Sequence, residues 1–153
     1  MSLRSRLIPF ALLAVAPAAA AQTAAGDWKF ETGQVAGICR LSGDMEISKP
    51  DAHGASTCRF VAKQSCPGDP PLEFSVQQSC SVARSGKKVE ITSRIERVLS
   101  VKPDDFLDTV KRGYAPDNFS VRLNASGTEM SGLFHSKSVS TVRFWRPNSD
   151  LVS

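Results

Sequence analysis

The strongest constraint on the fold of this chain is a repeated alternation of apolar and polar residues with a period of two. In the clearest run, Leu72, Phe74, Val76, Cys80 and Val82 alternate with polar residues. This period places one set of side chains on the buried face of a β-strand and the other set in water. Strand signals recur in seven other segments, residues 28–32, 39–47, 58–63, 89–99, 118–123, 129–135 and 139–146.

One segment, residues 103–112, carries helix signals instead. Pro103 stands in its first turn, Asp104 and Asp105 suit the positive end of the helix dipole, and Gly113 ends it. Eight short strands joined mostly by turns cannot form a parallel sheet, because each parallel connection needs a crossover of about a dozen residues. The sequence therefore predicts a single mainly-β domain, an antiparallel β-barrel or barrel-like sandwich of about eight strands with one short helix.

The first 21 residues predict a secretory signal peptide, which leaves residues 22–153 as one exported domain. Arg4 and Arg6 form a positive region, an apolar stretch follows, and a run of alanines suits cleavage after Ala21 or Ala25. Removing Arg4 and Arg6 reduces the formal net charge of +4 by two, so we expect no nucleic-acid binding, which needs a strong excess of basic residues. We expect a periplasmic or secreted protein without stable membrane insertion.

Four cysteines in an exported chain of this size predict two disulfide bonds. They are Cys39, Cys58, Cys66 and Cys80, and they lack the paired C-x2-C spacing of a metal site, so no metal is expected. If the loop at residues 66–71 joins two antiparallel strands, Cys58 falls opposite Cys80 or its neighbour. This favours Cys58–Cys80 with Cys39–Cys66, while the sequential pairing of Cys39 with Cys58 and Cys66 with Cys80 stays open.

The first and last strands of the predicted barrel carry the two parts of a short motif. Gly26-Asp27-Trp28 opens the first strand, and Arg143 or Arg146 lies near the end of the last. This resembles the Gly-x-Trp opening and closing arginine of lipocalin-like, or calycin, barrels. The resemblance implies that Trp28 plugs one end of the barrel and that an arginine, Arg146 or Arg143, stacks on it. The outline is also similar to small secreted bacterial inhibitors, including Inh-type protease inhibitor domains.

Two polar residues fall on predicted apolar strand faces and are candidate binding residues. Gln78 lies in register with Val76 and Cys80, and Arg97 shares its parity with Ile95. An inward Arg97 would hold a carboxylate or phosphate through paired hydrogen bonds. A bulge near Arg97 would turn the side chain outward instead.

No linear catalytic motif is present, neither a nucleophile elbow, a zinc-protease helix motif nor a phosphate-binding glycine loop. We therefore expect an exported non-enzymatic binding module without a cofactor. A protein-facing role, as an inhibitor or envelope-interaction protein, is preferred, with Pro70, Pro71 and Trp145 as contacts. One alternative is a small-ligand barrel that uses Arg97 and Gln78, and a second is a carboxylate-based hydrolase, which leaves no linear signature.

Overall fold

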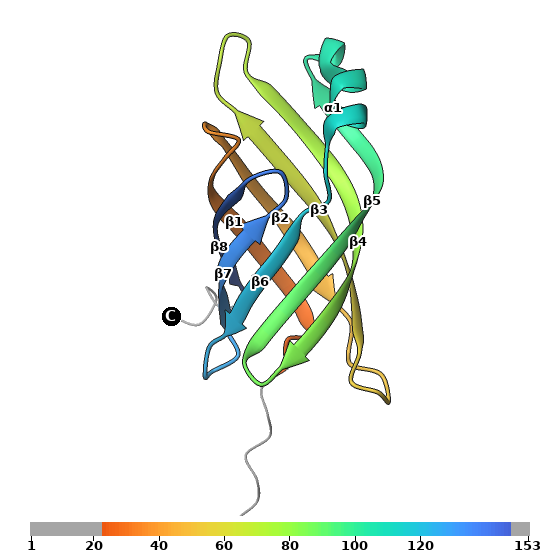
Figure 1. The fold of residues 1–153 in the computed structure, drawn as a ribbon, viewed down its shortest axis with the longest axis vertical. Coiled ribbons are helices and arrows are strands. Elements are labelled where there is room, and N and C mark those ends of the chain that lie inside the picture. Colours follow the sequence, from red (N-terminus) through yellow and green to blue (C-terminus); the bar gives the residue numbers. More distant parts are fainter. Residues whose placement is uncertain (1–22, 148–153) are drawn as a thin grey trace, which may run out of the picture.

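The computed structural model describes residues 23–147, so the predicted signal peptide lies outside the described residues. Eight antiparallel strands form one closed barrel in chain order, and β8 pairs back with β1 (Figure 1). The strands are β1 (Gly26–Val35), β2 (Cys39–Ile47), β3 (Ser56–Cys66), β4 (Leu72–Ser85), β5 (Lys88–Lys102), β6 (Asn118–Leu123), β7 (Glu129–His135) and β8 (Val139–Trp145). The predicted mainly-β antiparallel barrel is confirmed.

Phenylalanine rings fill the middle of the barrel. The alternation along each strand turns one side chain in two toward the axis, and the ring of Phe119 lies at the centre of the resulting cluster. Its centroid is within 5.8 Å of the ring centroids of Phe30, Phe60, Phe134 and Phe144. All five rings are buried, and most pairs meet edge to face, as aromatic quadrupoles favour. The central interior is therefore a packed core.

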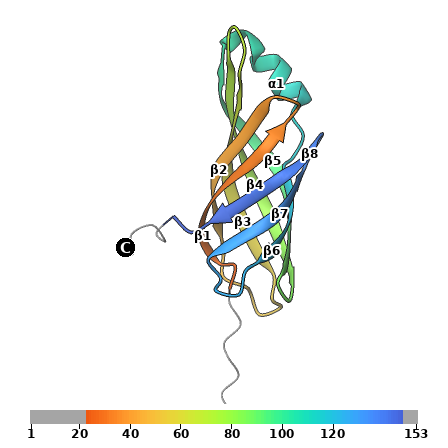
Figure 2. The same ribbon diagram turned by 90° about the vertical axis from the view of Figure 1, so that its left-hand side faces the viewer.

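The predicted helix is also confirmed. A 3₁₀ turn, η1 (Asp104–Phe106), leads into α1 (Leu107–Gly113), which lies at one end of the barrel beside β5 (Figure 2). We call this end, which also holds the β1–β2, β3–β4 and β7–β8 connections, the α1 end. The helix buries Val110 in a second apolar cluster with Phe74, Val76 and Val101. Within residues 23–147, no helix has the length and apolarity to cross a bilayer.

Both favoured disulfides are confirmed, and the sequential pairing is wrong. Cys58 of β3 and Cys80 of β4 lie directly opposite each other in the strand register and are bonded. Cys39 at the start of β2 is bonded to Cys66 at the end of β3. Each bond ties neighbouring strands together, and cross-links of this kind typically stabilise a domain by about 2–4 kcal/mol.

Two bulges in β5, near Arg97, determine which of its side chains point into the barrel and which point outward. Gln77 pairs with Arg97 but Gln78 pairs with Ile95, so Glu96 is an extra residue in β5; a second shift leaves Leu99 as another. Because one inserted residue reverses the alternation that follows it, Arg97 turns to the outer surface and is exposed. Of the two alternatives for Arg97, the structure therefore has the outward one produced by a bulge and not the inward one.

The end of the barrel opposite α1 is closed by Trp28, which is 1% exposed. Its indole Nε1 donates to the carbonyl of Ala24 at 2.8 Å, and the guanidinium carbon of Arg146 lies 3.7 Å from the centroid of the indole. Arg146 also donates to the carbonyl of Ala25 at 2.6 Å. Gly26 has φ +109°, and a Cβ there would lie 2.9 Å from Arg146 Nη1, so the glycine makes room for the arginine.

Replacing Arg146 with alanine should lower the free energy of unfolding by roughly 1–3 kcal/mol, because the change removes a cation–π contact and charge-assisted hydrogen bonds. Arg143→Ala is the matched control. Arg143 is exposed and lies 5.1 Å from the centroid of Trp145, so its loss should cost no more than about 0.5 kcal/mol. Urea denaturation followed by circular dichroism measures both. Equal losses in the two variants would show that Arg146 has no special role in closing the barrel.

Candidate ligand-binding site

The structure separates the residues that the sequence singled out for binding. Pro70 and Pro71 are exposed in the β3–β4 connection at the α1 end, whereas partly exposed Trp145 ends β8 near the opposite end. Arg97 lies on the outer surface, where its Nε donates to Gln77 Oε1 at 3.0 Å. Gln78 alone points into the barrel, and it is fully buried. These residues therefore do not form one site.

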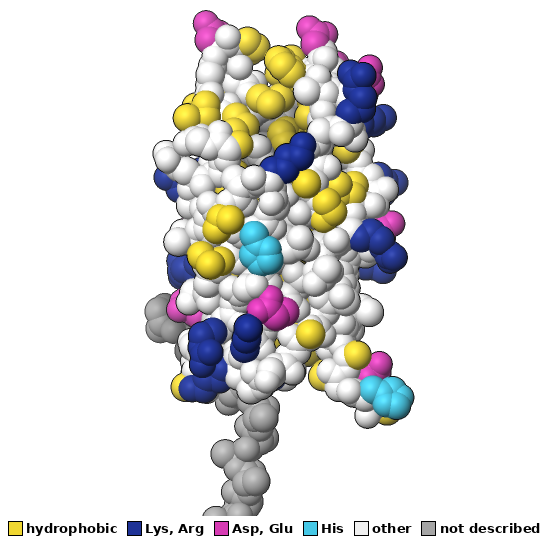
Figure 3. Space-filling model, in the orientation of Figure 1, with side chains coloured by type: hydrophobic (Ala, Val, Ile, Leu, Met, Phe, Trp, Pro, Cys, Tyr) yellow, Lys and Arg dark blue, Asp and Glu magenta, His cyan; other side chains and the backbone are white. Residues whose placement is uncertain are grey.

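A cavity of about 260 Å³ opens at the α1 end. It lies between the β1–β2 turn, α1 and the β7–β8 turn, and Leu72, Phe74, Phe106, Val110 and Phe134 supply most of its apolar wall. Figure 3 shows hydrophobic side chains gathered at this end between α1 and the β3–β4 connection. We call this cavity the α1-end pocket. It has the concave, mainly apolar form that is typical of small-molecule sites.

A larger depression of about 430 Å³ lies over the outer surface of β1, β2 and β3. Charged side chains of both signs line it, and the ion pair between Lys29 and Asp44 at 2.8 Å is part of its wall. Both partners are well exposed to water, so the depression is an ordinary solvated strand face. Volume alone therefore does not identify the site.

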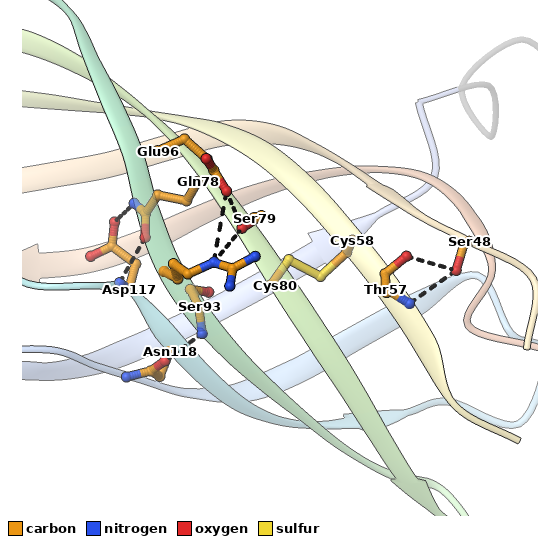
Figure 4. Close-up of a disulfide and its surroundings, with 11 residues drawn as sticks. Ser48, Thr57, Cys58, Gln78, Ser79, Cys80, Ser93, Glu96, Asp117 and Asn118 are labelled. Carbon is orange, nitrogen blue, oxygen red and sulfur yellow. Dashed lines mark hydrogen bonds and ion pairs between the residues drawn. A yellow bond between two sulfur atoms is a disulfide. The ribbon is translucent and has the colours of Figure 1, made fainter. Parts of the chain in front are cut away.

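A buried polar group formed by three residues from separate segments adjoins the α1-end pocket, and two of the three, Asp117 and Tyr114, line it. Asp117 directly precedes β6, Tyr114 follows α1, and Gln78 comes from the middle of β4. Oδ2 of Asp117 accepts hydrogen bonds from Gln78 Nε2 at 2.6 Å and from the Tyr114 hydroxyl at 2.5 Å. In return, the backbone N–H of Asp117 donates to Gln78 Oε1 at 3.0 Å (Figure 4).

Burial controls the ionisation of this group. Loss of water around Asp117 raises its pKa from 3.8 to about 6, although the hydrogen bonds from Tyr114 and Gln78 act in the opposite direction. Burial and the nearby Asp117 carboxylate raise the pKa of Tyr114 as well. At neutral pH, Asp117 is therefore mostly an anion held in an apolar wall by neutral donors. Perturbed ionisable groups in a pocket are typical of functional sites.

A second polar cluster lies on the outer surface of β5, β6 and β7. Ser120 Oγ is 2.9 Å from His135 Nε2, and it donates its proton to Glu90. This hydrogen bond from Ser120 is the main cause of the lowered pKa of Glu90. Because the serine proton goes to the carboxylate, His135 Nε2 must donate to Ser120. A histidine that activates a serine nucleophile does the reverse, so the cluster does not support hydrolysis.

The carboxylate-based hydrolase also lacks support from the α1-end pocket. Asp117 is the only acidic side chain in the pocket wall, whereas glycosidases of this type place two carboxyl groups on either side of the bond that they cleave. Among residues 23–147, no group of three side chains suited to metal binding is found.

Sequence reasoning found Gln78 but missed Asp117 and Tyr114. The alternation in β4 places Gln78 inside the barrel, whereas Asp117 and Tyr114 lie in the connection between the helix and the next strand, where no periodicity applies. The sequence did contain one signal for them: Gln78 is an inward polar residue, and a buried polar side chain needs a hydrogen-bond partner. No protein-family model and no curated protein matches this chain, so the site is interpreted from its geometry.

Replacing Asp117 with asparagine should change the pH dependence of stability. The folded pKa lies above the unfolded one, so the folded state holds the proton more tightly between about pH 4 and pH 6. As pH rises through this window, wild type should therefore lose roughly 3 kcal/mol of unfolding free energy relative to Asp117→Asn. Urea denaturation at several pH values measures the difference. Parallel curves for the two proteins would contradict the shifted pKa.

Proposed function

We propose that this protein is an exported, non-enzymatic binding module that takes a small, mainly apolar ligand in the α1-end pocket. The observation that carries the proposal is an apolar cavity whose wall contains the buried polar residues Asp117 and Tyr114, with Gln78 hydrogen-bonded to Asp117. Apolar walls supply affinity, and a few fixed polar groups supply orientation and specificity. The packed phenylalanine core supports a ligand position at the mouth of the barrel instead of its centre.

The volume of the pocket limits the size of the ligand. At about 260 Å³ it is smaller than the roughly 300–1,000 Å³ of sites for drug-sized compounds. The proposed ligand is therefore a small molecule or one apolar group of a larger one. Thr109 of α1 and Ser138 of the β7–β8 turn both line the cavity, so a ligand that fills it would contact both elements.

Two disulfides indicate an oxidising, extracytoplasmic environment. Together with the predicted signal peptide, they support the proposal that the protein acts in a periplasm or outside the cell. The closed eight-stranded barrel, with Trp28 beneath Arg146 at one end and a pocket at the other, supports a relationship to the lipocalin-like barrels. In this proposal, the end closed by Trp28 stabilises the barrel, and the α1 end binds the ligand.

Filling the pocket should abolish ligand binding without unfolding the barrel. Thr109 is exposed and lines the pocket, so Thr109→Trp would place an indole across its mouth. Ala125→Trp is a matched control, because Ala125 is exposed in the β6–β7 turn at the opposite end. The probe is N-phenyl-1-naphthylamine, an apolar dye that fluoresces in apolar surroundings.

We expect saturable dye binding to wild type and Ala125→Trp, and affinity at least about tenfold weaker in Thr109→Trp, since most of the buried apolar area is lost. Circular dichroism checks that all three proteins are folded. Equal binding by all three, or no binding by wild type, would overturn the proposed function.

A protein-facing role is the second candidate, and exposed apolar side chains around the same pocket favour it. Ile38 in the β1–β2 turn, Phe106 before α1 and Val139 at the start of β8 are 58%, 41% and 67% exposed. Pro70 and Pro71 directly precede Leu72, which lines the pocket. Apolar groups that gather around a cavity are typical of interaction surfaces, so the partner would insert an apolar side chain into the pocket.

A charged side chain among the exposed apolar residues around the pocket should prevent binding of the partner. Ile38→Asp should abolish capture of a crosslinked partner from envelope extracts of the source organism, because the carboxylate would have to be desolvated at the contact. Val61→Asp is the control, since Val61 is an exposed apolar residue on the outer surface of β3. A protein captured equally by both variants would not be a partner of this surface, and that result would overturn the second candidate.

A further inference from the structure

The carboxylate of Asp117 is buried without a positively charged neighbour. It is 1% exposed, and the donors that it accepts from are the Gln78 amide and the Tyr114 hydroxyl, both neutral. The ion pairs between described residues do not include Asp117. Buried carboxylates are normally paired with a cation, because an isolated buried charge is costly. The described part of the chain leaves this requirement unmet.

One carboxylate oxygen is free to receive a ligand. Both side-chain hydrogen bonds to Asp117 end on Oδ2, and Oδ1 accepts none from the described residues. Figure 4 shows the second oxygen of Asp117 directed away from Gln78. Asp117 also lines the α1-end pocket, so a ligand in the pocket lies beside a carboxylate whose Oδ1 accepts no hydrogen bond from the described residues.

The rest of the pocket wall fits an apolar body. Besides Asp117, the titratable side chains that line the pocket are Tyr114 and Lys137. Lys137 is exposed in the β7–β8 turn, so water screens its charge from the interior. The negative charge of Asp117 is therefore the dominant charge inside an otherwise apolar cavity.

We propose that the α1-end pocket binds a small primary ammonium compound with an apolar body, and that Asp117 is its counter-ion. The ammonium donates to Oδ1 of Asp117, while Gln78 and Tyr114 hold Oδ2 in place. The apolar body lies against Phe74 and Phe106. This inference rests on the proposed function, because it names the ligand class of the same pocket.

Three compounds with similar apolar bodies test the inference by calorimetric titration at neutral pH. They are 2-phenylethylamine, which is a cation, 2-phenylethanol, which is neutral, and 3-phenylpropanoate, which is an anion. A charge-assisted hydrogen bond should make the amine bind wild type at least about tenfold more tightly than the alcohol. The anion should bind most weakly, because it repels the carboxylate.

Asp117→Asn keeps the shape of the side chain and removes its charge. In this variant, the amine should bind at least about tenfold more weakly than to wild type, whereas the affinity for the alcohol should stay within about twofold. If the variant does not fold, wild type at lower pH is the second measurement. There, amine affinity should fall as pH drops below about 6 while alcohol affinity stays constant, because Asp117 becomes protonated.

The outcomes separate the two proposals. Equal wild-type affinities for the amine and the alcohol, both weakened by Thr109→Trp, would overturn the counter-ion role and leave the pocket as a binding site. Stronger binding of the anion would also overturn it. If none of the three compounds binds, and the naphthylamine dye does not bind either, both proposals fail.

Discussion

The reciprocal hydrogen bonds between Gln78 and Asp117 tie β4 to the start of β6, beside one of the two short strand pairings of the barrel wall. Six of the eight strand pairs run for six or more residues, whereas β1–β8 and β5–β6 each pair over four, the latter over Lys88–Ile91. Above that point, side chains hold the wall together: Gln78 of β4 binds both the carboxylate and the backbone N–H of Asp117, which precedes β6, and Asn118 of β6 accepts from the backbone N–H of Ser93 in β5. These contacts replace a main-chain ladder.

A charged side chain is an expensive means of joining two strands. A neutral group in place of Asp117 would give the same two contacts to Gln78 without the cost of burying a carboxylate. Natural proteins keep such costs mainly at functional positions. The position of Asp117 in the wall of an apolar cavity is consistent with this rule, and it links the structure of the barrel wall to the chemistry of the site.

The barrel, the helix and the disulfides could be predicted because each has a local signal. Alternation defines the strands, Pro103 and Gly113 bound the helix region, and a strand register puts Cys58 opposite Cys80. The site could be predicted only in part. Gln78 follows the alternation, whereas the orientation of Arg97 depends on a bulge at Glu96, and the alternation alone could not decide between the bulged and the regular strand. Asp117 and its neighbours take their positions from tertiary packing of an irregular connection.

The two β5 bulges have a further effect on how this protein behaves beside other copies of itself. Past Ile91, β5 continues to Lys102 without β6 alongside it, and a long regular strand edge is a template for aggregation. Inserted residues interrupt the spacing of the backbone donors and acceptors along such an edge, and Arg94 and Arg97 add charge to the same stretch. A second chain therefore finds no regular ladder to extend, which favours a protein that stays dispersed at high concentration.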